Sequence, residues 1–248
     1  MPAYQLLAFD TSTELMSIAV SCTREGVPHL WQYQGAAGAQ ASSRMLGAIM
    51  GLLSQAQMQL SEVDAICFGS GPGSFTGLRT ACSVAQGLAF GANVPVLPMD
   101  TLLAVAEEAR WTTLQGHQSL EITALIDARM DEMYVARYAY AHQQWTTLQP
   151  SSLVRPEELQ ATPLMAGNVF EVYGSRMPVC TQEPAQRIGA FPNATALLRL
   201  APQFLQQGQA VPAEHALPEY IRDKVAKTTQ ERVAEKAAMN TGHSAAKV

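Results

Sequence analysis

The chain has 248 residues, a formal net charge of −5 at pH 7 and a pI of about 5.5. Hydrophobic residues make up 48% of it and charged residues 15%, which is typical of a compact globular protein with one sizeable core, or with two small cores beside a cleft. Only 16 Lys and Arg residues are present, which is too few for a chain that binds nucleic acid without a partner. Neither a bilayer-spanning apolar run nor a basic N-terminal region is visible.

The first part of the chain predicts three strands and a helix. Residues Leu6–Asp10 form an apolar strand that ends in an aspartate and is followed by three hydroxyl residues, Thr11 to Thr13. Leu15–Cys22 and His29–Gln34 alternate as two further strands. Ser42–Gln57 follows with helical spacing and with more apolar positions than one core-facing stripe needs.

A glycine-rich run, Gly69–Arg79, joins a strand at Asp64–Phe68 to a helix at Phe75–Phe90. Unpaired amides and the helix dipole at such a turn suit an anion. The run has no lysine for a Walker A loop, and a proline stands at the first glycine position of a nucleophile elbow around Ser74. The same serine interrupts a Gly-x-Gly-x-x-Gly pattern, so a turn that only reverses the chain is the competing interpretation.

After this helix, the chain predicts a strand at Val94–Pro98 and a helix at Leu102–Arg110, with Asp100 or Thr101 as its N-cap. Two strands, Leu120–Asp127 and Glu132–Tyr140, then enclose the densest charged group of the chain. That group is either an ion-paired turn or a substrate-grasping element.

The last third predicts a strand-to-turn element at 165–168 and a helix at Thr195–Gln206. We expect Glu214–Arg222 to return to the first lobe, and 224–248 to be a frayed helix or a disordered tail. No internal repeat and no low-complexity linker divides the chain.

Cysteine and histidine spacing predicts no metal site. The four cysteines are far apart and fit strand or helix patterns, so we expect free buried thiols. The five histidines form no pair at helical spacing.

Four blocks of sequence, in order along the chain, carry a resemblance to a known family. They are Ala8–Glu14, Gly71–Arg79, Ile126–Tyr134 and Glu214–Arg222. Together they resemble the TsaB (YeaZ) family, the non-catalytic partner of TsaD in bacterial synthesis of tRNA threonylcarbamoyladenosine (t6A). The resemblance implies an α/β protein with the actin-like ATPase (ASKHA, RNase H-like) fold in two lobes: residues 1–110 plus about 212–224, then 111–211, with 225–248 as a flexible tail.

The function that this resemblance implies is that of a cytoplasmic scaffold without catalytic residues. It would pair with TsaD and recruit the TsaE ATPase for transfer of threonylcarbamoyl to adenosine 37 of tRNAs that read ANN codons. TsaD carries a His-x-x-x-His metal pair, and the corresponding stretch here, Met99–Val105, has no histidine. ATP and metal are therefore expected on the partner proteins, with tRNA bound only through the complex and a homodimer forming in isolation.

Two sets of site residues are implied. The helices at 42–57 and 75–90 are expected to bind TsaD through Met45, Leu46, Ile49, Met50, Leu53, Leu78, Ala81, Cys82 and Ala85. Burial of both helices against their own sheet would give the same apolar pattern. A vestigial phosphate site is expected at Asp10, Thr11, Ser12, Gly71, Gly73, Ser74, Thr76 and Arg79.

The sequence leaves two enzymatic alternatives. A phosphotransferase of the actin-like kinase type would use the cleft at Asp10 and the glycine loop, together with a second acidic residue as base. A peptidase would need a zinc pair or a nucleophile with a base, and neither pattern is visible in the sequence.

Overall fold

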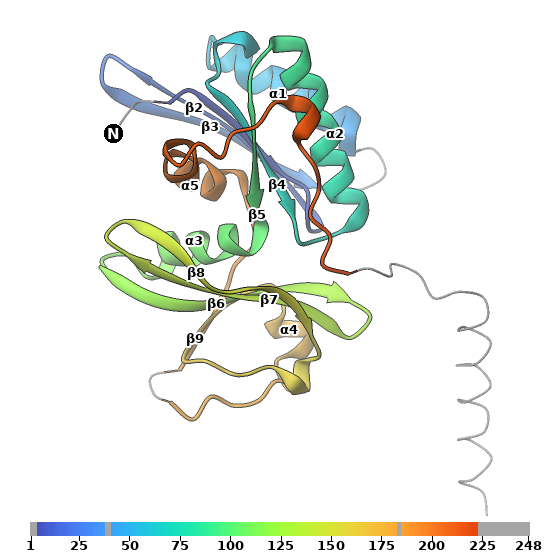
Figure 1. The fold of residues 1–248 in the computed structure, drawn as a ribbon, viewed down its shortest axis with the longest axis vertical. Helices are drawn as coiled ribbons and strands as arrows, with labels where there is room; N and C mark the ends of the chain where they lie inside the picture. The colour runs from blue at the N-terminus through green and yellow to red at the C-terminus, as the bar shows by residue number, and fades with distance from the viewer. Residues whose placement is uncertain (1–3, 38–40, 183–184, 223–248) are drawn as a thin grey trace, which may run out of the picture.

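The computed structural model describes residues 4–37, 41–182 and 185–222, and this part of the chain contains two five-stranded sheets (Figure 1). The first sheet has the strand order β3-β2-β1-β4-β5. Its strands are β1 (Leu6–Asp10), β2 (Leu15–Arg24), β3 (Val27–Ala36), β4 (Ala65–Gly71) and β5 (Val96–Asp100).

The second sheet repeats the topology of the first. Its strand order is β10-β9-β6-β7-β8. In each sheet the first three strands in chain order form an antiparallel meander. The fourth strand then pairs parallel with the first, and the fifth pairs parallel with the fourth. The strands are β6 (Ser119–Arg129), β7 (Glu132–Ala141), β8 (Gln144–Val154), β9 (Leu164–Gly167) and β10 (Gln186–Gly189). This duplication confirms the expected actin-like fold with two lobes.

Two strands of the second sheet, β8 and β10, have no counterpart among the elements expected from the sequence. Residues 144–154 are mostly polar and contain Pro150, which weakens a strand pattern. The structure explains the composition of β8, because β8 is an edge strand, where a proline and exposed polar side chains are tolerated.

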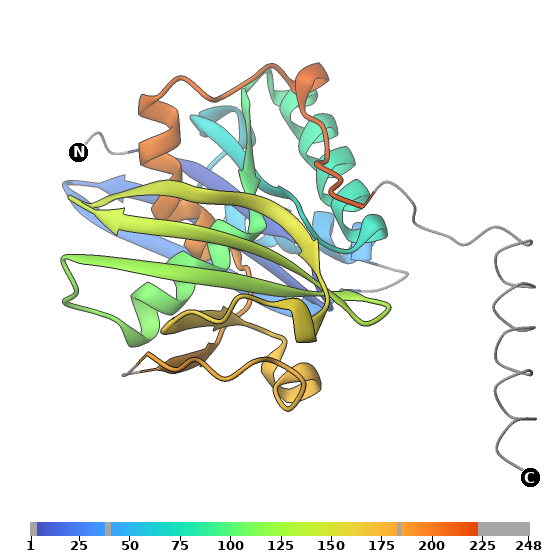
Figure 2. The same cartoon turned by 60° about the horizontal axis from the view of Figure 1, so that its bottom comes forward.

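The helices form two layers. Helices α1 (Ala41–Gln55) and α2 (Phe75–Ala92) cover the outer face of the first sheet, whereas α3 (Thr101–Thr113) and α5 (Ala194–Gln206) lie between the two sheets (Figures 1 and 2). The four-residue α4 (Phe170–Tyr173) packs on the far side of the second sheet. Single turns of 3-10 helix occupy Leu60–Glu62, Pro156–Glu158 and Ala213–His215.

Strand β1 shows how alternation divides the core. Leu7 and Phe9 point to the layer of α1 and α2, while Leu6 and Ala8 point to α3 and α5. The apolar cluster that contains Leu6 and Ala8 continues through α3 and α5 into β6 and β7, so one apolar core joins both sheets.

Helix α5 falls within the stretch 111–211 that is expected to form the smaller lobe, but most of its contacts with strands are with β1, β2, β4 and β5 of the first sheet. Helix α3 contacts strands of both sheets. The exact lobe boundaries stay a prediction, because the middle layer of helices is shared.

Local capping signals fix where these helices begin. Asp100 caps α3, as expected, and its carboxylate accepts hydrogen bonds from the amides of Leu102 (2.8 Å) and Leu103 (3.3 Å). Asn193 caps α5 in the same way through the amide of Ala196 (2.8 Å).

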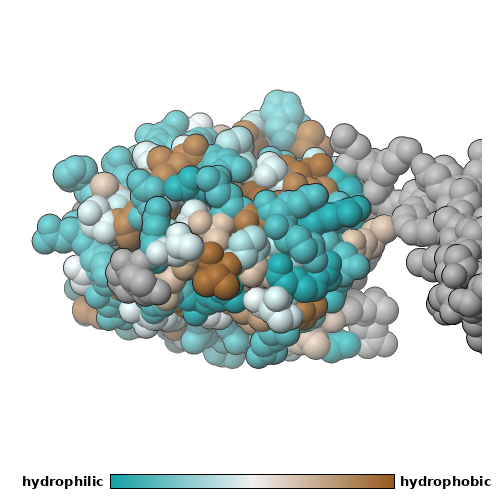
Figure 3. All heavy atoms as spheres, turned by 90° about the horizontal axis from the view of Figure 1, so that it is seen from below, coloured by the Kyte–Doolittle hydropathy of each residue, from teal (hydrophilic) through white to brown (hydrophobic). Residues whose placement is uncertain are grey.

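The chain from 213 to 222 lies along α2, where the Ala216 carbonyl accepts a hydrogen bond from Gln86 (2.8 Å) and the Glu219 amide donates to the Ser70 carbonyl (2.7 Å). The expected tail at 225–248 lies outside the described residues. Among the described helices, none is long and apolar enough to cross a membrane. On the face seen in Figure 3, apolar side chains form separate small groups among hydrophilic ones.

The shared core predicts that the two sheets unfold together. Leu197 of α5 is fully buried in that core, so Leu197→Ala should lower the free energy of unfolding by about 3 kcal/mol. Urea titration followed by far-UV circular dichroism and by tryptophan fluorescence should give one coincident transition, shifted as a whole. Two separate transitions in the variant would contradict a common core.

Candidate functional site

A cleft of about 580 Å³ lies between the two lobes. One wall is the turn after β1 together with the glycine loop and the start of α2, and the other is the hairpin between β6 and β7. The segment 219–222 forms a third side. Of the eight residues expected at a vestigial phosphate site, the structure places five in the lining: Thr11, Ser12, Gly73, Ser74 and Thr76.

The turn after β1 and the glycine loop are packed backbone to backbone. The Ser74 amide donates to the Ser12 carbonyl (2.7 Å), and the Thr11 hydroxyl donates to the Gly77 carbonyl (2.8 Å). A Cβ atom at Gly77 would lie 1.8 Å from the Thr11 carbonyl oxygen, and one at Gly73 would lie 2.6 Å from Ser12. Glycine is therefore required here by close approach of the chain to itself, and one loop amide already has an acceptor.

Asp10 lies behind this turn and does not line the cleft. Its Oδ1 accepts hydrogen bonds from the amide (2.9 Å) and hydroxyl (2.7 Å) of Ser12. Its Oδ2 is buried, finds no hydrogen-bond partner within the described part of the chain, and would touch any Cβ at Gly69. Burial raises the pKa of Asp10 from 3.8 to about 6, against the opposing effect of the Ser12 hydrogen bonds. The expectation that this carboxylate faces a phosphate is corrected, because it points into the protein.

Gly71 and Arg79 also lie outside the cleft lining. Gly71 has φ of +143° and leaves no room for a Cβ, which would come within 2.3 Å of the Glu219 carbonyl oxygen. Arg79 stacks on the ring of Phe75 at 3.8 Å and donates to the Tyr220 hydroxyl (3.0 Å). Both residues hold the segment 219–222 against the first lobe.

The charged group between β6 and β7 is an ion-paired turn. Arg129 pairs with Asp127 at 3.0 Å, Asp131 pairs with Arg176 at 2.8 Å, and Glu132 pairs with Arg222. Arg129, Met130 and Asp131 all have φ near +60° (61°, 56° and 61°), which places a tight hairpin turn at the mouth of the cleft. The Arg129 side chain is 73% exposed, so its ion pairs add little stability.

Several other lining residues were not expected at the site, among them Arg222, Asn168 and Tyr134. Arg222 reaches across from the end of the described chain, Asn168 accepts the Asp127 amide at its Oδ1 (2.9 Å), and Tyr134 projects from β7. Arg222 and Tyr134 belong to the sequence blocks quoted above, but only the fold brings Arg222 into contact with Glu132, 90 positions away.

The surface predicted for a partner needs correction. Seven of its nine residues are buried in this chain's own core and cannot form an outer surface: Met45, Ile49, Leu53, Leu78, Ala81, Cys82 and Ala85. Helices that cover a sheet bury their most apolar stripe against that sheet first. Leu46 (42% exposed) and Met50 (58% exposed) do lie on the outside.

The outer faces of α1 and α2 carry small residues beside these two side chains. Gly47 and Gly51 lie one turn apart on α1, and Gly87 and Gly91 lie one turn apart on α2. Among the described residues, a Cβ at any of these four glycines would meet no atom within 4 Å apart from its chain neighbours and its own helix backbone. We call this outer face of α1 and α2 the glycine face.

The arrangement of His, Cys, Asp and Glu side chains bears on metal binding. Among the described residues, no group of three His, Cys, Asp or Glu side chains is placed to hold a metal ion. The four cysteines are free and buried, as expected.

Comparison with known proteins decides the family. A family model described as TsaD: tRNA N6-adenosine threonylcarbamoyltransferase matches residues 35–247. The tRNA threonylcarbamoyladenosine biosynthesis protein TsaB of Haemophilus influenzae is 34% identical over 89% of this chain and 94% of its own length. The chain belongs to the TsaB (YeaZ) family. The TsaB of Escherichia coli is 29% identical over 90% of this chain and 96% of its own length. YeaZ from Pseudomonas aeruginosa, a solved structure, aligns with a TM-score of 0.75 and 36% identity over 88% of this chain and 99% of its own.

The buried carboxyl of Asp10 predicts a pH dependence of stability. Because burial raises its pKa above the ordinary value, the folded state binds the proton more tightly than the unfolded state does. Its stabilising contribution is complete below about pH 4 and is lost as the pH rises through about 6, a loss of about 3 kcal/mol. Asp10→Asn should remove this loss and be more stable than the parent at pH 8.

Urea unfolding at several pH values between pH 4 and pH 8 gives the slope of the free energy of unfolding against pH. Burial also raises the pKa of Asp100 to about 6, so Asp10→Asn should flatten the slope without abolishing it. Ser54→Ala, at an exposed residue without a titratable side chain, is the control and should leave the slope unchanged. Equal slopes for Asp10→Asn and the parent would contradict a raised pKa of the buried Asp10 carboxyl.

Two glycines of α2 should respond oppositely to alanine. Gly77→Ala places a Cβ against the Thr11 carbonyl and should destabilise the chain by about 2 kcal/mol or more. Gly87→Ala enters open space and should stabilise it by about 0.5–1 kcal/mol through helix propensity. Thermal unfolding of the two variants compares them directly; a neutral Gly77→Ala would mean that the loop has room to move.

Proposed function

We propose that this chain is a non-catalytic subunit in the biosynthesis of t6A in tRNA. The observation that carries the proposal is the match to TsaB proteins over nine-tenths of the chain, since those relatives are named for this pathway. In this role the chain pairs with TsaD, and the pair recruits the TsaE ATPase for threonylcarbamoyl transfer to adenosine 37 of tRNAs reading ANN codons. It acts in the cytoplasm.

The glycine face supports pairing with TsaD. Its four glycines allow another helix to approach α1 and α2 closely, and Leu46 and Met50 supply exposed apolar area beside them. Methionine suits such a surface because its flexible side chain adapts to a partner. In the absence of TsaD, the same face would bring two copies together as a homodimer.

The geometry of the cleft supports placing ATP, metal and tRNA contacts on the partner proteins. The glycine loop is packed against the turn after β1, and Asp10 is buried behind it. The charged residues of the β6–β7 hairpin are paired among themselves and with Arg176 and Arg222. With a net charge of −5, the chain would contact tRNA only as part of a complex.

The alternative, a phosphotransferase acting in the cleft, rests on the size of the cleft, which would admit a nucleotide. Such an enzyme needs a carboxylate directed at a metal-bound phosphate. Asp10 does not have that position, and the carboxylates in the lining belong to Glu14, Asp127 and Glu219. ATP turnover by the purified chain tests this alternative, and a rate abolished by Asp127→Asn would favour it.

A charge on the glycine face should break the complex. Gly51→Arg adds a long charged side chain at an exposed helical position where arginine is a good helix former, so the fold should be kept. Affinity for TsaD, measured by calorimetry, should fall at least 100-fold, and modification of tRNA by the reconstituted proteins should fall with it.

Thr112→Arg is the matched control, because it places the same side chain on the exposed part of α3. It should bind TsaD as the parent does. If Gly51→Arg is folded by circular dichroism and also binds TsaD as the parent does, the glycine face is not the interface.

A further inference from the structure

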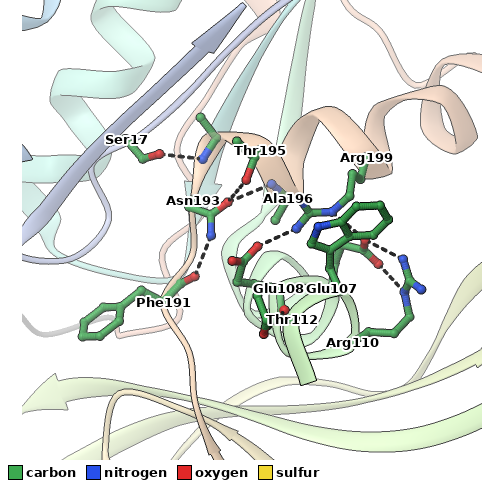
Figure 4. Close-up of polar contacts among 12 residues, drawn as sticks. Ser17, Glu107, Glu108, Arg110, Thr112, Phe191, Asn193, Thr195, Ala196 and Arg199 are labelled. Atoms are coloured by element: carbon green, nitrogen blue, oxygen red, sulfur yellow. Dashed lines mark hydrogen bonds and ion pairs between the residues drawn. The ribbon is translucent and has the colours of Figure 1, made fainter. Parts of the chain in front are cut away.

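A buried carboxylate outside the cleft joins three elements of the fold. Glu107 of α3 is 2% exposed, and its two oxygens accept hydrogen bonds from Arg110, Arg199 and Trp145. The Arg110 contacts are both 2.8 Å, the Arg199 contact is 2.8 Å and the Trp145 indole contact is 3.0 Å. Figure 4 shows Arg199 of α5 and Arg110 of α3 reaching the Glu107 carboxylate from different sides.

These donors belong to different layers. Arg199 is on α5, which packs on the first sheet, and Trp145 is on β8 of the second sheet. Arg199 also pairs with Glu108 at 2.5 Å. Gln203 of α5 exchanges two hydrogen bonds of 2.9 Å with the backbone of Trp145. The contacts around Glu107 therefore connect the first sheet, the middle helices and the second sheet.

Aromatic rings shield this cluster from solvent. The Arg199 guanidinium lies 5.0 Å from the centre of the Trp111 ring, and that of Arg110 lies 4.5 Å from the centre of the Tyr140 ring. The side chains of Arg110 and Arg199 are 16% and 20% exposed, and two carboxylates balance the two guanidinium groups. Charged groups removed from water in this way depend strongly on geometry, because misalignment leaves a buried charge unpaired.

Helix α3 is also held at its other end. The Tyr138 hydroxyl of β7 donates to Asp100, and the Thr101 hydroxyl donates to the Pro72 carbonyl in the glycine loop. Glu107 lies about 10 Å further along the helix, at 1.5 Å per residue. Attachment at two separated points prevents the helix from pivoting between the sheets.

We propose that Glu107 is a positioning residue that holds the two sheets at one angle and so keeps the cleft at a fixed width. The chain then presents itself to any partner as one rigid body rather than as two lobes that close on a ligand. This property does not depend on which partner binds the glycine face.

The distance between the lobes measures this directly. The variant Ser83→Cys, Val172→Cys places one exposed thiol on α2 and one on α4, and the four native cysteines are buried. With nitroxide labels at both sites, electron–electron double resonance gives the distribution of distances, and the labelled parent without these two changes sets the background. Glu107→Gln should widen the distribution at least two-fold.

Two control variants separate positioning from stability. Glu121→Gln removes an ion pair with Arg137 that lies wholly within the second sheet, and Met165→Ala opens a cavity in the core of that sheet. Both should leave the distribution unchanged although Met165→Ala lowers stability. A folded Glu107→Gln with the parent's distribution overturns the proposal.

Should Glu107→Gln fail to fold, Trp145→Phe takes its place, because it keeps a ring and removes one donor to Glu107. It should widen the distribution to a smaller extent. An unchanged distribution in that variant would overturn the proposal equally.

Discussion

The layer of α3 and α5 between the two sheets is the constraint on which the rest of this structure depends. Each sheet has one face against this layer, so neither sheet could bury its apolar side chains alone. The apolar cluster that includes Leu6, Leu197 and Tyr138 runs through all three layers. The lobes of this protein are consequently two halves of one core, and the cleft lies at the edge of a continuous packed structure.

The glycine loop illustrates how one motif can be built for packing as well as for binding. Orphan amides at a helix N-terminus attract anions, but here the Ser74 amide is taken by the Ser12 carbonyl, and Gly77 admits the Thr11 backbone. The small residues that bring a phosphate close to a backbone are equally suited to bringing two backbone segments together. Asp10 then lies behind the contact, where the cost of its burial is expressed as a raised pKa.

The sequence predicts those features that depend on residues close together in the chain. It does not predict the features that depend on tertiary contacts. The N-cap Asp100 follows from short-range chemistry and could be predicted, as could most strands. Burial of Ile49 and Ala85 could not, since a helix facing its own sheet and a helix facing a partner show the same apolar periodicity. The duplicated topology leaves no visible repeat in the sequence, and the Glu107 contacts join residues 38 and 92 positions apart.

A fold with two sheets around a cleft can serve assembly once its halves no longer move. Binding costs free energy for every group that must be ordered, so a preformed surface loses less on association than a mobile one. In this chain Glu107 joins α3 to Arg199 of α5, which packs on the first sheet, and to Trp145 of the second sheet, and the ion pair of Glu132 with Arg222 joins the second sheet to the segment along α2. The outer face of α1 and α2 is thus supported from beneath by the whole molecule. Rigidity of this kind would suit a subunit that aligns a partner, because the position of its surface is set before the partner arrives.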